Sequence, residues 1–336
     1  MSTPRAFLLD VPAPRGIRPE RRTLHVSVPA HCYVPRVLET HGLRGYEPES
    51  TSVALALTEG VAGRRWFYDV GANVGLFSWL VRVACPDLGV VAFEPTPDLA
   101  ATARTVLGDN RLGGEVEELA LGSSAGAARL YLSNTSDASN SLNQDFRRVE
   151  RYVEVELSTL DAYVESTDRI PALVKIDTES TEPDVVRGGL RTLTEHRPWI
   201  ICEVLGRGGG PQLTSLLEPL GYTFHPIDDR LPLRRRSLIV GEQGEHRNWL
   251  FAPAPITSDL LDRIAAWRSA LQHCGPRTSF VVTSPPTSTA RGTTRAGRLA
   301  RRACALLPPP RDQAALALLG DVRDLITGHP PRRGPR

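Results

Sequence analysis

The sequence of 336 residues has few of the features that would place it in a membrane or build it around disulfides or zinc. No run of eighteen apolar residues occurs, which excludes an ordinary transmembrane helix. The N-terminus lacks the apolar segment of a secretory signal peptide. The five cysteines are scattered and form no C-x-x-C pair, a pattern typical of reduced thiols rather than of a disulfide or zinc frame. These absences predict a cytoplasmic protein without a membrane segment.

Lysine is almost missing as well: Lys175 is the only one, and the other 39 basic residues are arginines. The net charge of +2 hides an asymmetry, because residues 276–336 carry eleven arginines against three aspartates, while residues 1–275 are acidic overall. The Pro/Arg-rich tail is predicted to be largely disordered, with a short helix at 314–326, and it has two interpretations: a solvated disordered arm, or a segment that docks on an acidic protein partner. No aromatic platform accompanies the arginines, which disfavours nucleic acid as the partner, and the residues indicate no oligomeric state.

Composition and periodicity predict an N-terminal leader and cap (1–45), a main domain (46–255), a C-terminal helix (256–275) and the basic tail (276–336). Residues 1–22 are rich in Pro and Arg and are expected to be ill-ordered. Apolar runs predict strands at 24–28, 66–70, 90–93, 116–121, 127–132, 153–157, 173–176, 199–202, 221–225 and 248–251. Helical patterns lie at 47–59, with a cap expected at Ser50 or Thr51, and at 76–83, 99–107, 184–193 and 259–271. This alternation predicts an α/β fold, a mostly parallel sheet with helices on both faces.

The most informative stretch is RWFYDVGANVGLFSWLVRVA at residues 65–84, which predicts a strand, a glycine turn and a helix in direct succession. Gly71 permits the sharp turn and Gly75 the close approach of helix and strand. A dinucleotide fingerprint is excluded, because Asn73 and Leu76 stand where its second and third glycines would be. The turn therefore predicts a cofactor site of another kind.

Two acidic residues indicate which cofactor that is. Asp69 beside the turn favours a cationic ligand over a diphosphate, and Glu94 after the next strand suits a pair of ribose hydroxyls. S-adenosylmethionine has both features, a positively charged sulfonium and a ribose. An ordinary strand–turn–helix without a ligand is the alternative.

The candidate catalytic residues follow later strands, where ligands sit in parallel sheets. Asp177 is our first choice for the base that takes the proton of an acceptor hydroxyl, with Glu179 and Glu203 as second choices. The three carboxylates are also a ligand set for Mg²⁺, which would lower the pKa of the hydroxyl. His225 is a further candidate base. Asp177 as a helix cap or as a ligand of the cofactor's amino group, and His225 as a structural residue, remain alternatives.

The polar segment 133–148, rich in Ser and Asn, has two interpretations. One is a surface loop, and the other is a lid over the active site whose Asn140 and Ser141 face the substrate.

Four blocks, DVGANVGLFS, AFEPTPD, VKIDTESTEPDVVRGG and PWIICEV, make residues 46–253 resemble the FkbM-type branch of the S-adenosylmethionine-dependent methyltransferases. The chain departs from the usual family form by placing Ser180 where the family has glycine. The resemblance implies a Rossmann-like, seven-stranded sheet with an antiparallel last strand, and O-methylation of a sugar, polyketide or other secondary metabolite. It implies cofactor contacts at the turn and strand ends, which we expect at Asp69, Gly71, Ala72, Asn73, Gly75, Glu94, Pro95, Ala120 and Asp177.

The sequence thus predicts an S-adenosylmethionine-dependent O-methyltransferase acting on a hydroxyl of a small or carrier-tethered metabolite. Three other hypotheses stay open. In the first, the acceptor group is an amine or a carboxylate. In the second, the acceptor is a nucleic acid, and in the third, the protein binds the cofactor without catalysing a reaction.

Overall fold

The structure is a computed structural model that describes residues 5–13, 21–61, 65–134, 136–146, 150–206, 208–241 and 247–276. They all belong to one compact unit, residues 1–281. The tail with its expected helix at 314–326 lies outside the described residues. Within the described ranges, no helix combines the length and apolar character needed to cross a membrane.

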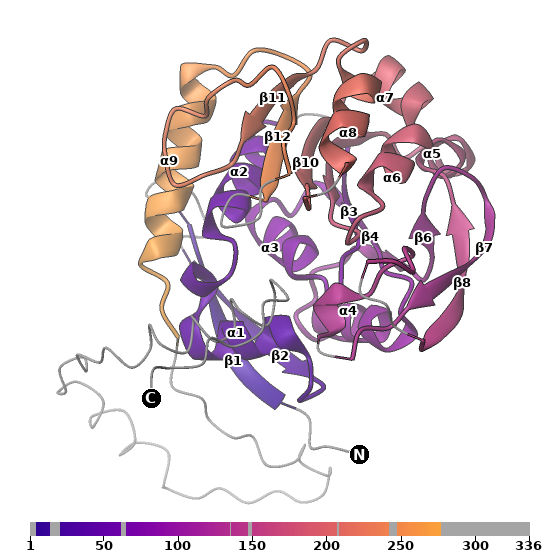
Figure 1. Cartoon of the computed structure of the whole chain (residues 1–336). Helices are drawn as coiled ribbons and strands as arrows, with labels where there is room; N and C mark the ends of the chain where they lie inside the picture. The colour runs from indigo at the N-terminus through magenta and orange to yellow at the C-terminus, as the bar shows by residue number, and fades with distance from the viewer. Residues whose placement is uncertain are drawn as a thin grey trace, which may run out of the picture. The chain divides into compact units, whose positions relative to one another are not determined.

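A seven-stranded sheet forms the centre of this unit (Figure 1), with the strand order β11-β12-β10-β9-β3-β4-β5. β12 runs antiparallel to both of its neighbours, and the other pairs are parallel. This confirms the predicted fold class and its antiparallel last strand. The strands are β3 (Trp66–Val70), β4 (Gly89–Phe93), β5 (Glu115–Glu117), β9 (Pro171–Ile176), β10 (Trp199–Glu203), β11 (Thr223–Pro226) and β12 (Asn248–Ala252).

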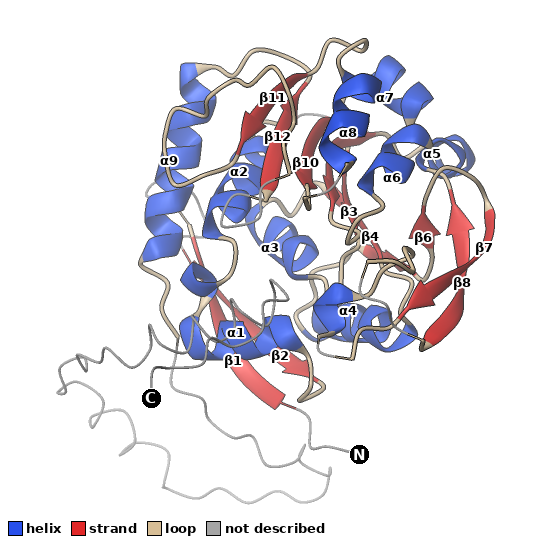
Figure 2. Ribbon diagram, viewed as in Figure 1, coloured by secondary structure: helices blue, strands red, loops and turns tan. Residues whose placement is uncertain are grey.

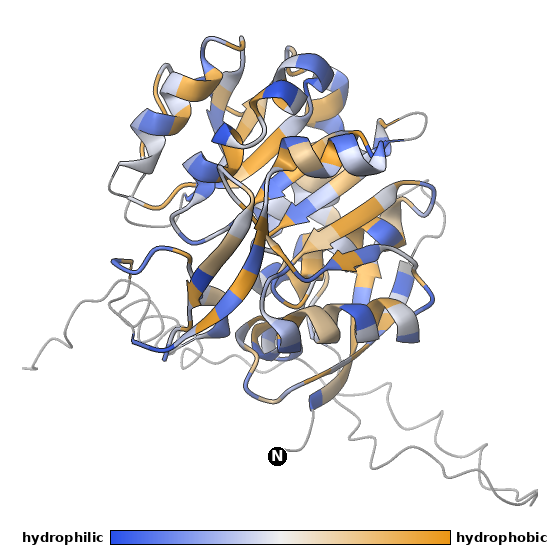
Figure 3. Cartoon of the chain, turned by 90° about the vertical axis from the view of Figure 1, so that its right-hand side faces the viewer, coloured by the Kyte–Doolittle hydropathy of each residue, from blue (hydrophilic) through white to orange (hydrophobic). Residues whose placement is uncertain are grey.

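Helices flank the sheet on both faces (Figure 2), because each face presents apolar side chains that must be covered. One hydrophobic core joins the sheet to α2 (Pro48–Glu59), α3 (Leu76–Ala84), α4 (Pro97–Asp109) and α9 (Ser258–Gln272). The other joins it to α5 (Leu160–Thr167), α6 (Glu182–Arg187), α7 (Leu190–His196) and α8 (Gly209–Leu217). Figure 3 shows the hydrophobic colour concentrated on the central strands.

The prediction of an ill-ordered leader at 1–22 was wrong for its described part. β1 (Arg5–Pro12) pairs antiparallel with β2 (Arg21–Val28). Alternate side chains of this pair are buried and join the first core: Phe7, Leu9, Val11, Leu24, Val26 and Val28. The alternation of apolar and other residues in β1 is flanked by prolines and arginines in the sequence, and this composition favoured the prediction of disorder. α1 (Tyr33–His41) and a short 3-10 helix, η1 (Leu43–Gly45), lead on to α2.

A cap of α2 at Ser50 or Thr51 was also a wrong expectation. Every residue from Ser50 to Thr58 is buried, because α2 lies between the sheet and α9 and is covered all round. The helix begins instead after Glu47, whose backbone is left-handed with φ 44°.

A second sheet of three strands stands beside the large one, in the order β6-β8-β7. The expected single strand at 116–121 is divided between the two sheets: β5 pairs with β4, and β6 pairs with β8. The strands are β6 (Ala120–Leu121), β7 (Gly126–Tyr131) and β8 (Tyr152–Ser158), with the 3-10 helix η2 (Asp137–Ser139) between the last two.

The helix predicted at 184–193 is in fact two, α6 and α7, separated at Gly188 and Gly189. A Cβ on Gly188 would lie 2.0 Å from the carbonyl oxygen of Gly122, so the two backbones approach more closely than any side chain permits. This contact, which no local pattern contains, lies where the first helix ends.

Candidate active site

The glycine turn after β3 brings the ends of three strands together. The amides of Gly71 and Ala72 both donate to the carbonyl oxygen of Phe93, at 3.0 Å. Gly71 has φ 78°, and a Cβ there would lie 1.9 Å from the carbonyl oxygen of Asp177. Gly75, at φ 91°, is the N-cap of α3. The turn therefore lies directly against the carboxyl ends of β4 and β9.

Glu94 is fixed beside this turn. Its two carboxylate oxygens accept hydrogen bonds from the amides of Asn73 and Thr96, each at 2.8 Å. The side chain is buried, and burial raises its pKa to about 7 against the opposing effect of these bonds. Asn73 Oδ1 is buried without a partner among the residues that the structure describes. An orphaned oxygen next to a carboxylate is suited to a ligand that carries hydroxyl or amine donors.

Asp69 lies beneath the turn rather than on its surface. Its Oδ2 accepts from the amide of Ser78 at 3.1 Å and from the Ser78 hydroxyl at 2.8 Å. Burial raises the pKa of Asp69, and the charge of Lys175 opposes that rise. Of the other expected cofactor contacts, Pro95 is half-buried next to Glu94, and Ala120 is buried in β6.

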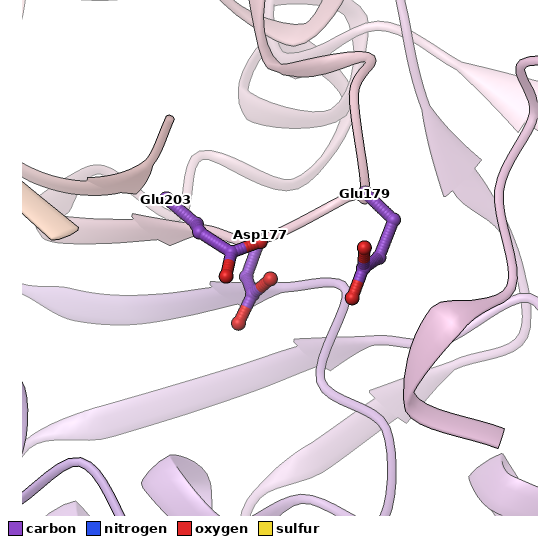
Figure 4. Close-up of side chains that lie close together, drawn as sticks. All are labelled: Asp177, Glu179 and Glu203. Atoms are coloured by element: carbon purple, nitrogen blue, oxygen red, sulfur yellow. The ribbon is translucent and has the colours of Figure 1, made fainter. Parts of the chain in front are cut away.

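Asp177, Glu179 and Glu203 come together at the carboxyl ends of β9 and β10 (Figure 4). One carboxylate oxygen from each lies within 4.8 Å of the others. Glu203 is 8% exposed, and its Oε2 is buried with no hydrogen-bond partner in the described ranges. Burial, followed by the charges of Asp177 and Glu179, raises the pKa of Glu203 well above its usual value. The cluster thus contains a carboxyl that readily holds a proton.

The single lysine of the chain belongs to the same site. Lys175 is buried, and its Nζ donates to Asp177 Oδ2 at 2.6 Å while lying 4.6 Å from the centre of the Phe77 ring. Burial opposes its charge, but the neighbouring carboxylates, Asp177 first, raise the pKa of Lys175 above its usual value. Lys175 is therefore a cation at neutral pH, and it fixes one oxygen of Asp177.

The loop that carries Glu179 has an unusual backbone. Glu179 has φ 55° and Ser180 has φ 91°, so two consecutive residues other than glycine adopt left-handed conformations. The loop wraps around Glu182, whose Oε1 accepts from the amides of Thr178 at 3.1 Å and of Ser180 at 2.9 Å. Ser180 thus occupies a conformation that favours the glycine it replaces.

The described part of the polar segment, residues 133–134 and 136–146, lies against both the glycine turn and the acidic loop. The Ser141 hydroxyl donates to the carbonyl oxygen of Glu179, and Asn143 Nδ2 donates to Ser180 Oγ at 3.1 Å. At the other side, Asn73 Nδ2 donates to the carbonyl oxygen of Asp137 at 3.3 Å. Asn140 instead binds within the segment, where its Oδ1 accepts from the Ser133 amide at 2.9 Å. A substrate contact of Ser141 or Asn140 stays a prediction.

His225 is not brought to the carboxylates. It lies in β11, with β12 between it and β10. Its Nε2 is 3.0 Å from Thr223 Oγ1, and its Nδ1 is 3.3 Å from the carbonyl oxygen of Leu233. Both ring nitrogens are engaged, and burial lowers its pKa. These contacts match the structural alternative for His225.

Two residues that sequence reasoning missed, Tyr46 and Glu47, enter the site from the N-terminal side. Glu47 Oε2 accepts from Asn248 Nδ2 at 3.2 Å, and Asn248 pairs in register with Glu203. Burial raises the pKa of Glu47 to about 7, with Lys175 lowering it. Their only local signal is the position just before a helix, and the hydrogen bond from Asn248 to Glu47 joins residues 201 apart in the sequence.

The sequence has recognisable relatives. The model of the methyltransferase FkbM domain family matches residues 69–252. The 31-O-demethyl-FK506 methyltransferase FkbM of Streptomyces tacrolimicus is 36% identical over 63 residues, 19% of this chain and 24% of that protein. The methyltransferase sdnD of Sordaria araneosa is 27% identical over 187 residues, 46% of this chain and 72% of that protein. The chain thus spans about a quarter of the first relative's length.

Two solved structures are also similar. A methyltransferase FkbM from Methylobacillus flagellatus KT aligns with a TM-score of 0.37 and 14% identity, over 57% of this chain and 45% of that one. The METTL16 methyltransferase domain aligns with a TM-score of 0.41 and 13% identity, over 69% of this chain and 74% of that one.

Proposed function

The chain belongs to the methyltransferase FkbM domain family, and from that membership we propose that it is an S-adenosylmethionine-dependent O-methyltransferase. Its acceptor is a hydroxyl of a small or carrier-tethered metabolite. The observation that carries the proposal is the placement of Asp177, Glu179 and Glu203 directly beside the glycine turn of β3. A cofactor turn and a cluster of proton-accepting groups at one sheet edge are the two parts that such a transfer needs.

The residues around the turn fit the cofactor. Each oxygen of Glu94 accepts one amide hydrogen and keeps a second lone pair, which a ribose hydroxyl can use. Asn73 Oδ1 is orphaned beside it. Asp69 and Asp177 together carry one more negative charge than Lys175 beside them balances, which favours a positively charged sulfonium over a diphosphate. When bound, the cofactor supplies an activated methyl group.

The acidic residues then act on the acceptor. An alcohol is a poor nucleophile until its proton leaves, so a carboxylate within hydrogen-bond reach must take that proton. The oxygen of Asp177 that Lys175 holds is fixed in place, which suits orientation of the acceptor. Glu203 Oε2 has no such partner, and the raised pKa of Glu203 makes its ionised carboxylate the stronger proton acceptor of the two.

Mg²⁺ is a second proposal at the same three carboxylates, whose hard oxygens are the ligands that this ion prefers. The cytoplasmic location and the acidic protein partner of the basic tail also stay predictions, as does a biosynthetic role in secondary metabolism.

The test has two steps. Calorimetry of the full chain with S-adenosylmethionine and with its demethylated product first measures cofactor binding. Candidate hydroxylated metabolites are then screened by mass spectrometry for the gain of one methyl group, with and without chelator. Binding without turnover in any acceptor class, and no binding by well-folded protein, are the two results that contradict the proposal. Loss of turnover on chelation supports Mg²⁺, and unchanged turnover rejects it.

A further inference from the structure

Asp137 joins three parts of the chain that are far apart in the sequence. It lies in η2, and its Oδ1 accepts a hydrogen bond from the amide of Tyr33 at 2.9 Å. Its carbonyl oxygen accepts from Asn73 Nδ2 at 3.3 Å, and the Asn73 amide in turn donates to Glu94 Oε2 at 2.8 Å. Asp137 is therefore connected, through a single residue, to the carboxylate that the proposed site uses for the ribose of the cofactor.

The N-terminus of α1 holds the carboxylate of Asp137 in place. Tyr33 is the first residue of α1, and the N-cap residue Cys32 gives the helix no side-chain hydrogen bond. Asp137 supplies that bond from another part of the chain, and the positive end of the helix dipole favours a negative charge there. The position of this carboxylate is thus set by the fold, with one oxygen used for α1.

The other oxygen of this carboxylate has no such use. Asp137 Oδ2 is buried and has no hydrogen-bond partner within the described ranges. The Cys32 thiol also interacts with the carboxylate, but a thiol is only a weak donor. Asn73 Oδ1, on the side chain that binds the backbone of Asp137, is orphaned as well. Buried polar atoms are nearly always paired, so orphaned oxygens on two residues bonded to each other indicate a ligand that brings donors.

Resting on the proposed function, we propose that Asp137 binds the cofactor, with Oδ2 accepting a hydrogen bond from one ribose hydroxyl while Glu94 accepts from the other. Each hydroxyl donates one hydrogen, so two carboxylates hold two hydroxyls without competing for them. Asn73 donates to both residues and thereby fixes their spacing. Through Tyr33, which precedes the family match at 69–252, α1 becomes part of the cofactor site.

The ribose is the part of the cofactor that this arrangement reaches. It forms the middle of S-adenosylmethionine, whereas the 6-amino group and the methionine ammonium lie at the two ends of the molecule. Asn73 alone separates Asp137 from Glu94, so both carboxylates serve the same part of the ligand.

The test combines changes in the protein with changes in the ligand. Calorimetry of the full chain measures binding of S-adenosylhomocysteine and of its 2′-deoxy and 3′-deoxy analogues. In the parent protein we expect each missing hydroxyl to weaken binding about tenfold, the value of one hydrogen bond to a charged group. In Asp137→Ala, one of the two missing hydroxyls should cost less than about threefold, because its partner is gone. Asp137→Asn, which keeps an oxygen for the Tyr33 amide, should lower the cost of the same hydroxyl.

The matched control is Asp98→Asn, which removes the charge of an exposed carboxylate in the first turn of α4. It should keep the full cost of both missing hydroxyls. Binding that weakens equally for all three ligands in both Asp137 variants would make Asp137 a structural residue and overturn the inference. Unchanged binding in these variants overturns it too, as does a parent protein that binds the deoxy analogues as tightly as S-adenosylhomocysteine. Failure of the parent to bind S-adenosylhomocysteine at all would instead contradict the proposed function.

Discussion

Ser180 stands where the family has glycine, and its backbone is strained. Its φ of 91° is one that side chains rarely adopt, and its hydroxyl accepts from Asn143. We expect Ser180→Gly to be more stable than Ser180→Ala by about 1 kcal/mol, because both lose the hydroxyl but only alanine keeps the strain. Urea denaturation of the two variants measures the difference. At a position with negative φ, the alanine variant would be more stable than the glycine variant. If Ser180→Ala is the more stable of the two, the interpretation is refuted.

A second prediction for single residues concerns the ion pair of Lys175 and Asp177. Asp177→Asn leaves a buried ammonium without its partner, and we expect a loss of about 3 kcal/mol in the free energy of unfolding. Adding Lys175→Met removes that uncompensated charge, so the double variant should regain much of the stability and none of the activity. Chemical denaturation together with methyl transfer measures both effects. If the single variant is as stable as the parent, the pair is not a buried ion pair.

At the scale of an element, residues 136–146 join the glycine turn to the acidic loop. Removing the donors of Ser141 and Asn143 by alanine substitution should loosen residues 177–182 and weaken S-adenosylhomocysteine binding several-fold. Each lost hydrogen bond is worth about 1 kcal/mol. Hydrogen exchange of that loop and calorimetry report the two effects.

The control for this prediction is Gln144→Ala, because Gln144 is exposed within the same segment. Exchange in the loop should match the parent protein in this control. Equal exchange in the double alanine variant would show that the segment is a surface loop and not a lid.

For the whole molecule, buried carboxyls predict how stability depends on pH. Burial raises the pKa of Glu94 and of Glu182 from 4.5 to about 7. The folded protein therefore binds more protons than the unfolded chain in this window. These two groups contribute stability that is complete below pH 4.5 and is lost as the pH rises through about 7. Glu94→Gln and Glu182→Gln should flatten the decline in the free energy of unfolding.

The exposed Glu154 provides the reference for that experiment. Glu154→Gln should leave the slope of stability against pH as it is in the parent. An identical slope in all three variants would show that neither buried carboxyl holds a raised pKa.

Much of the fold follows from local sequence. The apolar run before Gly71, the turn and the helix after it are encoded within twenty residues, and parallel strands bring their carboxyl ends to one edge. That rule places Asp177 and Glu203 together, and the structure does bring them together. Local pattern also fails predictably, since β1 is hidden by its Pro/Arg-rich surroundings and the split of 116–121 depends on which sheet each half joins.

The sequence by itself determined the strand–turn–helix unit, the order of strands and helices, and the acidic residues at the strand ends, because these depend on neighbours in the chain. Only the tertiary structure decided that Tyr46 and Glu47 enter the site, that Lys175 pairs with Asp177, and that His225 stays outside it. Those outcomes depend on contacts between residues far apart in sequence, such as Glu47 with Asn248, and on burial that no local pattern encodes.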